Sequence, residues 1–267
     1  MTTIKITALV ENISDGSVKS AHGLSFYIET KMHKLLFDVG PNSTLFENAV
    51  KKHIDLSQVD TVIISHGHKD HGGALKRFLE INKTAKVYLQ KGAFDEHFVK
   101  VLFFKISISL DKELADNSRI VLIDGDHKID DELTLFTSKA SDSFHSKANS
   151  NLYAGKAPDD FRHEQNLLIH GDKDVVIMGC GHAGVINILK SAAPARPSYC
   201  IGGFHVFDPI SRRTVPKAQL DELSSGLKRF ADVKFFTCHC TGKKAYRYLK
   251  QRHANISYFC CGKQLNI

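Results

Sequence analysis

The stretch Thr61-Val-Ile-Ile-Ser-His-Gly-His-Lys-Asp-His-Gly-Gly73 decides how this chain folds and what it can bind. It begins with a β-branched run that is typical of a short buried strand. After the glycine pair, the apolar residues Leu75, Phe78 and Leu79 recur at helical spacing. The sequence therefore places three histidines and one aspartate on a loop between a strand and a helix.

The spacing within this loop is that of a metal site. In an extended segment, residues two apart project to the same side, so His66 and His68 can converge on one ion. Asp70 and His71 then turn toward a second point, and the motif suits one ion or two. The alternative interpretation, surface histidines on a polar loop, would require the pattern to arise by chance, which is rare at this histidine and aspartate content.

Three later histidines repeat this arrangement. His182, His205 and His239 each stand just past the end of an apolar, strand-like run. Loops at the carboxyl ends of strands are where α/β sheets place their ligand-binding residues. A single histidine in such a place is structural about as often as it is functional. Together with the first cluster, however, the three form a constellation of candidate ligands.

Four motifs resemble the metallo-β-lactamase superfamily. The first is the His-x-His-x-Asp-His loop, preceded by Leu35-Leu-Phe-Asp-Val-Gly40. The other three are similar to one branch, that of the methanogen dihydropteroate synthase-like enzyme that joins a dihydropterin to a ribosyl-aminobenzene phosphate. They are Met178-Gly-Cys-Gly-His182, Ile201-Gly-Gly-Phe-His205 and Cys238-His-Cys-Thr-Gly242. The resemblance runs in patches from about Gly23 to Gly242 and lapses between about Lys91 and Asp160.

This resemblance implies an α/β fold of four layers, an αββα sandwich in which two sheets pack face to face with helices outside. It also implies one domain over residues 1–267, with a variable insertion at about residues 91–160. Composition agrees with a single compact domain, because 267 residues at 42% hydrophobic content can bury most of their apolar surface.

Hydrophobic patterning predicts strands alternating with helices. The strands are expected at residues 4–10, 24–30, 33–37, 62–65, 86–89, 120–123, 133–137, 166–170, 175–179, 198–201 and 234–237. The helices are expected at residues 44–53, 73–81, 184–191, 216–230 and 242–251.

The resemblance also divides the candidate ligands into two sets of three. The first ion would be held by His66, His68 and His182, and the second by Asp70, His71 and His239. The chain departs from the superfamily at the aspartate that normally bridges the ions, where His205 stands with Asp208 three residues on. His205 is open to three roles: a metal ligand, an acid/base or substrate contact, or a structural residue. Asp70 and His205 are the candidate catalytic residues.

Three further residues are candidates for supporting roles. Asp38 is expected to orient the first loop by accepting backbone or histidine hydrogen bonds, although an ordinary turn aspartate is the alternative. Thr241 and Gly242 open an expected helix directly after His239, so their backbone N–H groups could bind a phosphate. A plain helix cap explains the same two residues equally well.

Charge and composition narrow the class of protein. The formal net charge of +7 suggests a mild positive field that favours anionic substrates, but the basic residues are spread along the chain, which makes nucleic-acid binding unlikely. Six cysteines without a Cys-x-x-Cys pair fit a reduced, cytoplasmic protein, and Cys180, Cys200 and Cys238 are expected to be core residues. The start of the chain lacks the apolar core of a signal peptide, and no apolar run reaches the roughly 18 residues of a membrane span.

These observations predict a metal-dependent hydrolase or phosphate-ester-processing enzyme acting on a pterin-like or other anionic small molecule. It would use a metal-bound hydroxide or metal-assisted loss of phosphate or pyrophosphate. Zinc, as one or two ions, is the default for imidazole and carboxylate ligands, with manganese or iron as alternatives. A metal-binding or redox-sensing module without turnover is the alternative function, and the altered bridging position favours it. The sequence leaves the oligomeric state open.

Overall fold

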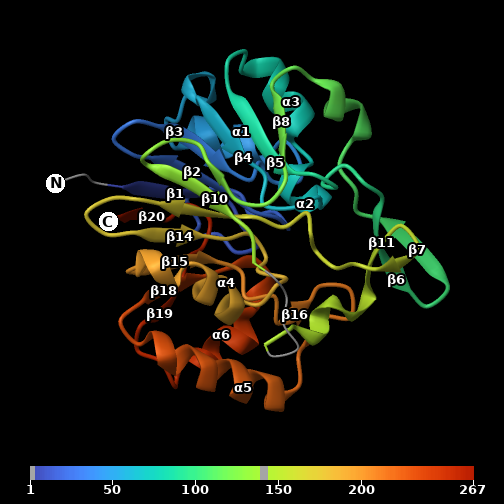
Figure 1. Ribbon diagram of the computed structural model, residues 1–267, viewed down its shortest axis with the longest axis vertical. Coiled ribbons are helices and arrows are strands. Elements are labelled where there is room, and N and C mark those ends of the chain that lie inside the picture. Colours follow the sequence, from blue (N-terminus) through green and yellow to red (C-terminus); the bar gives the residue numbers. More distant parts are fainter. Residues whose placement is uncertain (1–3, 139–143) are drawn as a thin grey trace.

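The computed structural model describes residues 4–138 and 144–267 and arranges them in four layers (Figure 1). Two large sheets face each other in the middle of the molecule, and helices cover their outer faces. The αββα sandwich expected from the sequence is thereby confirmed.

Each large sheet has seven strands. The first sheet runs, in spatial order, through β20 (Gln264–Asn266), β1 (Lys5–Val10), β2 (Ser25–Glu29), β3 (Lys34–Phe37), β4 (Thr61–Ile63), β5 (Lys86–Gln90) and β8 (Ile120–Ile123). The second runs through β19 (Ile256–Tyr258), β18 (Lys234–Thr237), β15 (Tyr199–Gly202), β14 (Val175–Ile177), β13 (Asn166–Ile169), β10 (Leu133–Phe136) and β9 (His127–Lys128).

Helices from the two halves of the chain cover opposite faces. The first sheet carries α1 (Thr44–Lys51), α2 (Lys69–Gly72) and α3 (Leu75–Ile81), and the second carries α4 (Val185–Ser191), α5 (Lys217–Leu227) and α6 (Lys243–Lys250) (Figure 1). Short 3-10 turns lie at Leu56–Gln58, Lys112–Asp116, Lys147–Asn151, Ala193–Ala195, Lys228–Phe230 and His239–Thr241. None of the helices in the described parts of the chain is both long and apolar enough to cross a lipid bilayer.

Apolar side chains fill the three spaces between the four layers. Phe26, Phe37 and Ile177 belong to the core between the two sheets, where both sheets are buried. Leu75 packs with the outer face of the first sheet, and Leu223 with that of the second. Because both faces of each sheet are covered, their strands are almost continuously apolar, which is why the sequence showed them clearly.

The direction of the strands brings the candidate ligands together. In the first sheet β3, β4, β5 and β8 are parallel neighbours, and in the second β14, β15, β18 and β19 are parallel neighbours. The loops that follow β4, β14, β15 and β18 carry the predicted histidines and lie at the carboxyl ends of these strands.

A third, smaller sheet projects beside this edge (Figure 1). It contains β12 (Ala157–Pro158), β11 (Leu152–Ala154), β6 (His97–Val101) and β7 (Phe104–Ser107), and a separate hairpin pairs β16 (Phe207–Asp208) with β17 (Arg213–Thr214). The sequence analysis missed these strands because they are short, and those other than β6 also lack buried apolar residues. It also placed Asp70 and His71 on a loop, whereas the structure has them in the short helix α2.

Candidate metal centre

Four buried histidine rings face one another in two pairs. Nε2 of His66 lies 3.4 Å from Nε2 of His182, and Nε2 of His71 lies 3.3 Å from Nε2 of His239. Two nitrogens bound to one tetrahedral ion at about 2.05 Å would be separated by about 3.3 Å. Each pair therefore has the spacing of two ligands on a common ion.

The other ring nitrogen of the first pair is already engaged in a hydrogen bond. His182 Nδ1 lies 2.8 Å from Asn149 Oδ1, an atom that can only accept a hydrogen bond. His66 Nδ1 lies 2.8 Å from Ser65 Oγ, whose own hydroxyl proton goes to Asp38. In both neutral rings the proton is therefore on Nδ1, and the Nε2 lone pairs are left facing each other.

The second pair follows the same rule. His71 Nδ1 lies 2.6 Å from Asp38 Oδ2, and His239 Nδ1 lies 2.9 Å from Asn12 Oδ1. Both partners are acceptors, so both Nδ1 atoms donate and the two Nε2 atoms are left facing each other. Two facing Nε2 atoms need a proton or a metal ion between them, and with both Nδ1 atoms engaged elsewhere this is the observation that fits the residues to a metal ion.

The remaining predicted ligands lie beside these pairs. Asp70 Oδ2 is 3.3 Å from His239 Nε2 and 3.7 Å from His71 Nε2, which places the carboxylate on the second pair. His68 is close enough to His66 and His182 for one atom of each to reach a common ion. The structure thus brings the two predicted sets of three together in one place.

Charge differs between the two halves of the centre. Burial, together with the neighbouring histidines, lowers the pKa values of His66, His68 and His182 well below the usual value, so these rings are neutral and ready to bind metal. Burial acts the same way on His71, but the carboxylates of Asp38 and Asp70 outweigh it and raise its pKa to about 9. These two carboxylates therefore favour a positive charge at this ring, which is a proton in the metal-free protein and which a bound ion would replace.

Buried carboxylates fix the loops that carry the ligands. Asp38 accepts hydrogen bonds from the Ser65 backbone at 2.7 Å and from His71, so it holds the first loop and a ligand ring together. Glu164 accepts the backbone N–H groups of His182 and Ala183 at 2.7 and 2.9 Å, and burial raises its pKa to about 7.

Glu11 holds the last histidine loop in the same way. Its Oε1 accepts the His239 backbone N–H at 2.6 Å and the Tyr258 hydroxyl at 2.7 Å. Burial raises the pKa of this carboxyl group. The position of His239 is therefore set by a strand at the other end of the chain, a pairing that no local sequence pattern indicates.

His205 and Asp208 stand at different depths. The His205 ring lies 4.0 Å from the ring of His182, centroid to centroid, and neither of its nitrogens has a hydrogen-bond partner among the described residues. The ring is buried beside the first pair, within reach of an ion there. Asp208 lies on the rim, where its Oδ1 accepts the backbone N–H of Ile210.

The structure favours the helix-cap interpretation of Thr241 and Gly242. Their backbone N–H groups donate to the carbonyl groups of Cys238 and His239 at 3.0 and 3.4 Å, so neither is free for a phosphate. The Thr241 hydroxyl is also buried and accepts the Phe204 N–H. Gly242 has φ +71° and stands directly before α6, a conformation that glycine adopts without strain.

The sequence analysis missed several residues at this centre. Cys180 was expected in the core, but its sulfur lies 3.3 Å from His71 Nε2, whereas Cys200 and Cys238 pack among apolar side chains as expected. Cys180 stands two residues before His182, and that extended spacing was the available signal. Cys240 lies beside it and contacts the Cys180 carbonyl.

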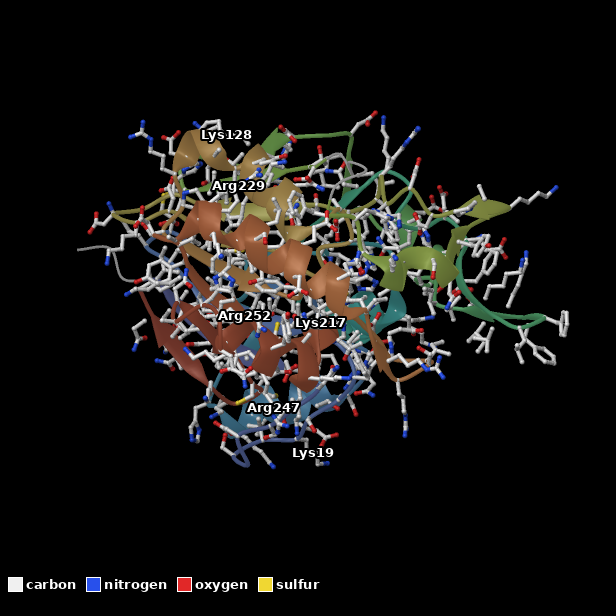
Figure 2. All side chains as sticks on the ribbon, turned by 90° about the horizontal axis from the view of Figure 1, so that it is seen from below. Lys19, Lys128, Lys217, Arg229, Arg247 and Arg252 are labelled. Carbon is white, nitrogen blue, oxygen red and sulfur yellow. The ribbon has the colours of Figure 1, made fainter. Side chains whose placement is uncertain are left out.

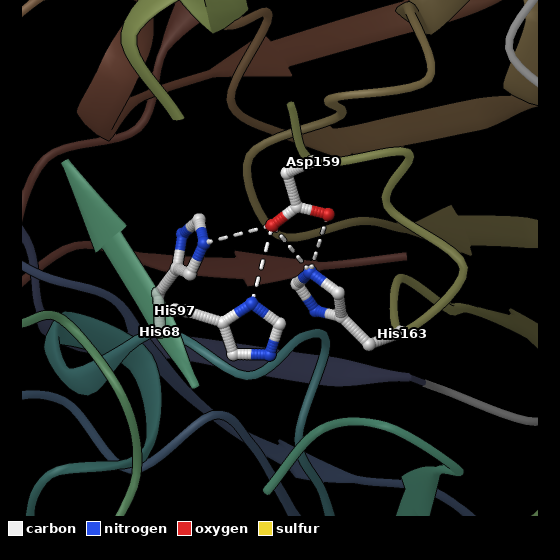
Figure 3. A group of neighbouring side chains, drawn as sticks. All are labelled: His68, His97, Asp159 and His163. Carbon is white, nitrogen blue, oxygen red and sulfur yellow. Dashed lines mark hydrogen bonds and ion pairs between the residues drawn. The ribbon is translucent and has the colours of Figure 1, made fainter. Parts of the chain in front are cut away.

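A second histidine cluster adjoins the outer side of His68 (Figure 3). Asp159 lies at its middle, 4.0 Å from His68 Nε2, 3.2 Å from His97 Nδ1 and 3.0 Å from His163 Nε2. His97 and Asp159 come from the stretch in which the sequence resemblance lapses, and His163 lies just after it. No pattern in that stretch marked them.

A cavity of about 420 Å³ opens over the centre. The metal-site residues form its floor, and apolar side chains of the small sheet, including Val99, Ile106 and Leu152, form one wall. A second cavity of about 530 Å³ shares His239 with the first and is lined by Arg212, Arg213, Lys243 and Lys244.

The comparisons with known proteins agree with this geometry. The family model of the metallo-β-lactamase superfamily matches residues 21–145. A 7,8-dihydropterin-6-methyl-4-(β-D-ribofuranosyl)-aminobenzene-5′-phosphate synthase of Methanocaldococcus jannaschii is 28% identical over 91% of this chain and 89% of its own. An uncharacterized protein of the same organism is 26% identical over 98% of this chain and all of its own.

Among solved structures, Tm1679 resembles the chain over its whole length. It is described as a metal-dependent hydrolase of the β-lactamase superfamily. The two share 25% identity and superpose with a TM-score of 0.81, covering 99% of both chains.

Proposed function

We propose that the chain is a metal-dependent enzyme of the metallo-β-lactamase superfamily that cleaves or transfers an anionic small molecule, supported by the family model over residues 21–145 and the likeness to Tm1679. The observation that carries the proposal is the pair of facing Nε2 atoms in each half of the centre, with every Nδ1 proton already engaged. Divalent ions bound there would polarise a substrate oxygen and lower the pKa of a water molecule.

The chain's own residues have separable tasks in this proposal. His66, His68 and His182 would hold one ion, and His71 and His239 a second. The Asp70 carboxylate would both bind metal and orient the nucleophile, because it stands beside the second pair with one side open to the cavity.

An anionic substrate is supported by the distribution of charge. The cavity beside His239 carries four basic side chains and opens next to the metal centre, so an anionic group could bind there while the reacting bond lies over the centre. Elsewhere the cations are dispersed: those labelled in Figure 2 are spread over the face, and Lys19, Lys128 and Lys217 pair with neighbouring carboxylates. This dispersion argues against a nucleic-acid stripe.

The names of the relatives point to two different reaction classes. The methanogen relative is named as a synthase of a pterin-containing phosphate ester, and Tm1679 as a hydrolase. We therefore retain both reaction classes, with zinc as the default ion and the cytoplasm as the expected location. A sensing module without turnover is the second candidate, and the two adjacent thiols of Cys180 and Cys240 favour it.

The test combines metal content with turnover. Purified protein should contain transition metal and should act on at least one of a panel of chromogenic phosphodiester, phosphomonoester, lactone and lactam substrates. Asp70→Ala should lose turnover by about 100-fold or more even where metal remains. His170→Ala, which removes a partly exposed ring that contacts Thr134 and Asp174, is the matched control and should behave as wild type. Metal binding without turnover on any substrate would favour the sensing module, and absence of metal would overturn both candidates.

A further inference from the structure

Cys180 lies where the two halves of the centre meet. It is one residue beyond Gly179, at which a Cβ atom would stand 2.2 Å from Ser65 Oγ, so only glycine lets this strand end approach the first histidine loop so closely. The approach brings the Cys180 sulfur to 3.3 Å from His71 Nε2. Cys180 is buried and lines the floor of the cavity over the centre.

The sulfur is within ligand range of both halves. One ligand atom from each of His66, His71 and Cys180 lies within 4.8 Å of the other two. The same is true of Cys180 with His182 and His205, and of Cys180 with His239 and Cys240. The three groups draw on the first pair, on the second pair and on both, and Cys180 is common to all of them.

Charge balance also calls for a second anion. Two divalent ions would bring four positive charges into a buried site in which Asp70 is the one carboxylate among the candidate ligands, while Asp38 and Asp159 lie behind the imidazoles of His71 and His68. A buried dication is stabilised most by an anion that binds it directly. A thiolate at Cys180 would supply a second negatively charged ligand, since metal coordination deprotonates a thiol.

We propose that Cys180 provides a thiolate ligand shared between the two halves of the metal centre. This inference rests on the proposed metal binding and adds the identity of the shared ligand. A sulfur ligand selects softer ions, so zinc, cobalt(II) or iron(II) should bind in preference to magnesium or manganese. His205, whose nitrogens are without partners among the described residues, then stands on the first half of the centre beside the same sulfur.

The competing explanation is a buried thiol that donates a hydrogen bond to His71 and contacts no metal. Cobalt(II) distinguishes the two, because a thiolate bound to cobalt(II) gives an intense near-ultraviolet charge-transfer band that a thiol cannot give. Metal-stripped protein titrated with cobalt(II) alone should develop this band. Cys180→Ala should lack the band and bind cobalt(II) on the order of 100-fold more weakly. Cys180→Asp should regain affinity without the band.

Cys238→Ala is the matched control. Cys238 is fully buried, immediately precedes His239 and packs in the core between the sheets, so its loss should leave the band unchanged. Wild-type protein that binds cobalt(II) without the band would overturn the shared thiolate while leaving the proposed metal-dependent function intact. A band that survives in Cys180→Ala and disappears in Cys240→Ala would overturn it in favour of the neighbouring thiol. Protein that binds no metal would overturn the proposed function itself. Should Cys180→Ala fail to fold, Cys240→Ala decides: a band that persists in that variant supports Cys180 as its source, and a band lost with Cys240 overturns the proposal.

Discussion

Two buried histidine clusters share His68 but differ in what faces their ring nitrogens. In the candidate metal centre, ring nitrogens face ring nitrogens, and every Nε2 of the two pairs lies opposite another Nε2 at the spacing of two metal ligands. In the neighbouring cluster, the rings of His97 and His163 face the Asp159 carboxylate instead (Figure 3). The first cluster needs an ion from outside the chain, whereas the second contains its own counter-charge.

The proton positions sharpen this difference. His163 Nδ1 accepts the Gly67 backbone N–H at 2.9 Å, so the proton of the neutral ring is on Nε2 and points at Asp159. Both nitrogens of His97 face acceptors: Nε2 lies 3.0 Å from the Gly92 carbonyl oxygen and Nδ1 lies 3.2 Å from Asp159. Burial opposes ionisation of Asp159, but hydrogen bonds from His163, His97 and the Phe161 backbone outweigh it and lower its pKa. His68, His97, Asp159 and His163 each place one possible ligand atom here. The hydrogen bonds among them nevertheless indicate that the cluster orients His68 and does not bind a further metal ion.

The largest expected effect comes from removing metal. The ions would tie together loops that follow four different strands, so chelation should lower the melting temperature of the wild type by about 10 °C, corresponding to about 4 kcal/mol at an ion concentration of about 1,000 times the dissociation constant. Calorimetry with and without chelator measures it. A His66→Ala variant should show a smaller shift, because half of the centre is already lost. An unchanged melting temperature in the wild type would mean that the first histidine cluster, like the second, is stable without a metal ion.

His205 should show the next largest effect. It belongs to the metal side of the comparison, because it is buried with both ring nitrogens unpartnered among the described residues. If it is a ligand, His205→Ala should lower metal occupancy and His205→Asp should restore it. If it acts on the substrate, both variants should keep their metal and lose rate by about 100-fold. Metal counts and rates on the same preparations decide, and wild-type values for both in His205→Ala would make the residue structural.

Asp159→Asn should weaken metal binding without removing a binding site. The amide keeps the shape but loses the charge that faces His68, so the affinity for cobalt(II) should fall by roughly 10- to 100-fold at unchanged stoichiometry. Competition with a chromophoric chelator measures the affinity, and elemental analysis at saturation measures the stoichiometry. Loss of one whole equivalent of metal would show that the second cluster is itself a metal site and would break the comparison.

The sequence alone predicted the residues of the candidate metal centre but not those of the neighbouring cluster, for a physical reason. His66, His68, Asp70 and His71 are adjacent in the chain, and the later histidines follow apolar strands whose periodicity is strong. Most strands of both large sheets were predicted for the same reason, since strands buried on two faces have continuous apolar sequences. The short edge strands β9, β19 and β20 were not predicted.

The supporting residues carry no such signal. Glu11 reaches His239 across 228 positions of sequence, and Asp159 reaches His68 from a segment of short strands. Their roles depend on tertiary contacts made after the chain has folded. Cys180 is an intermediate case, because its spacing from His182 was visible but a cysteine at a strand end is usually a core residue.

The smallest expected effect is that of His163→Gln. Its ring accepts one hydrogen bond from Gly67 and donates to Asp159, so its loss should lower the free energy of unfolding of the metal-free protein by about 1–2 kcal/mol. His163 contacts Asp159 and carries no negative charge toward His68. Metal affinity should therefore change by less than about 10-fold, which is less than in Asp159→Asn. Urea unfolding and the same chelator competition measure the two quantities. Nitrogen-15 NMR of the wild type should find the His163 proton on Nε2 with metal bound or absent. Deprotonation of that nitrogen on adding metal would identify it as a ligand and would assign the second cluster to the metal centre after all.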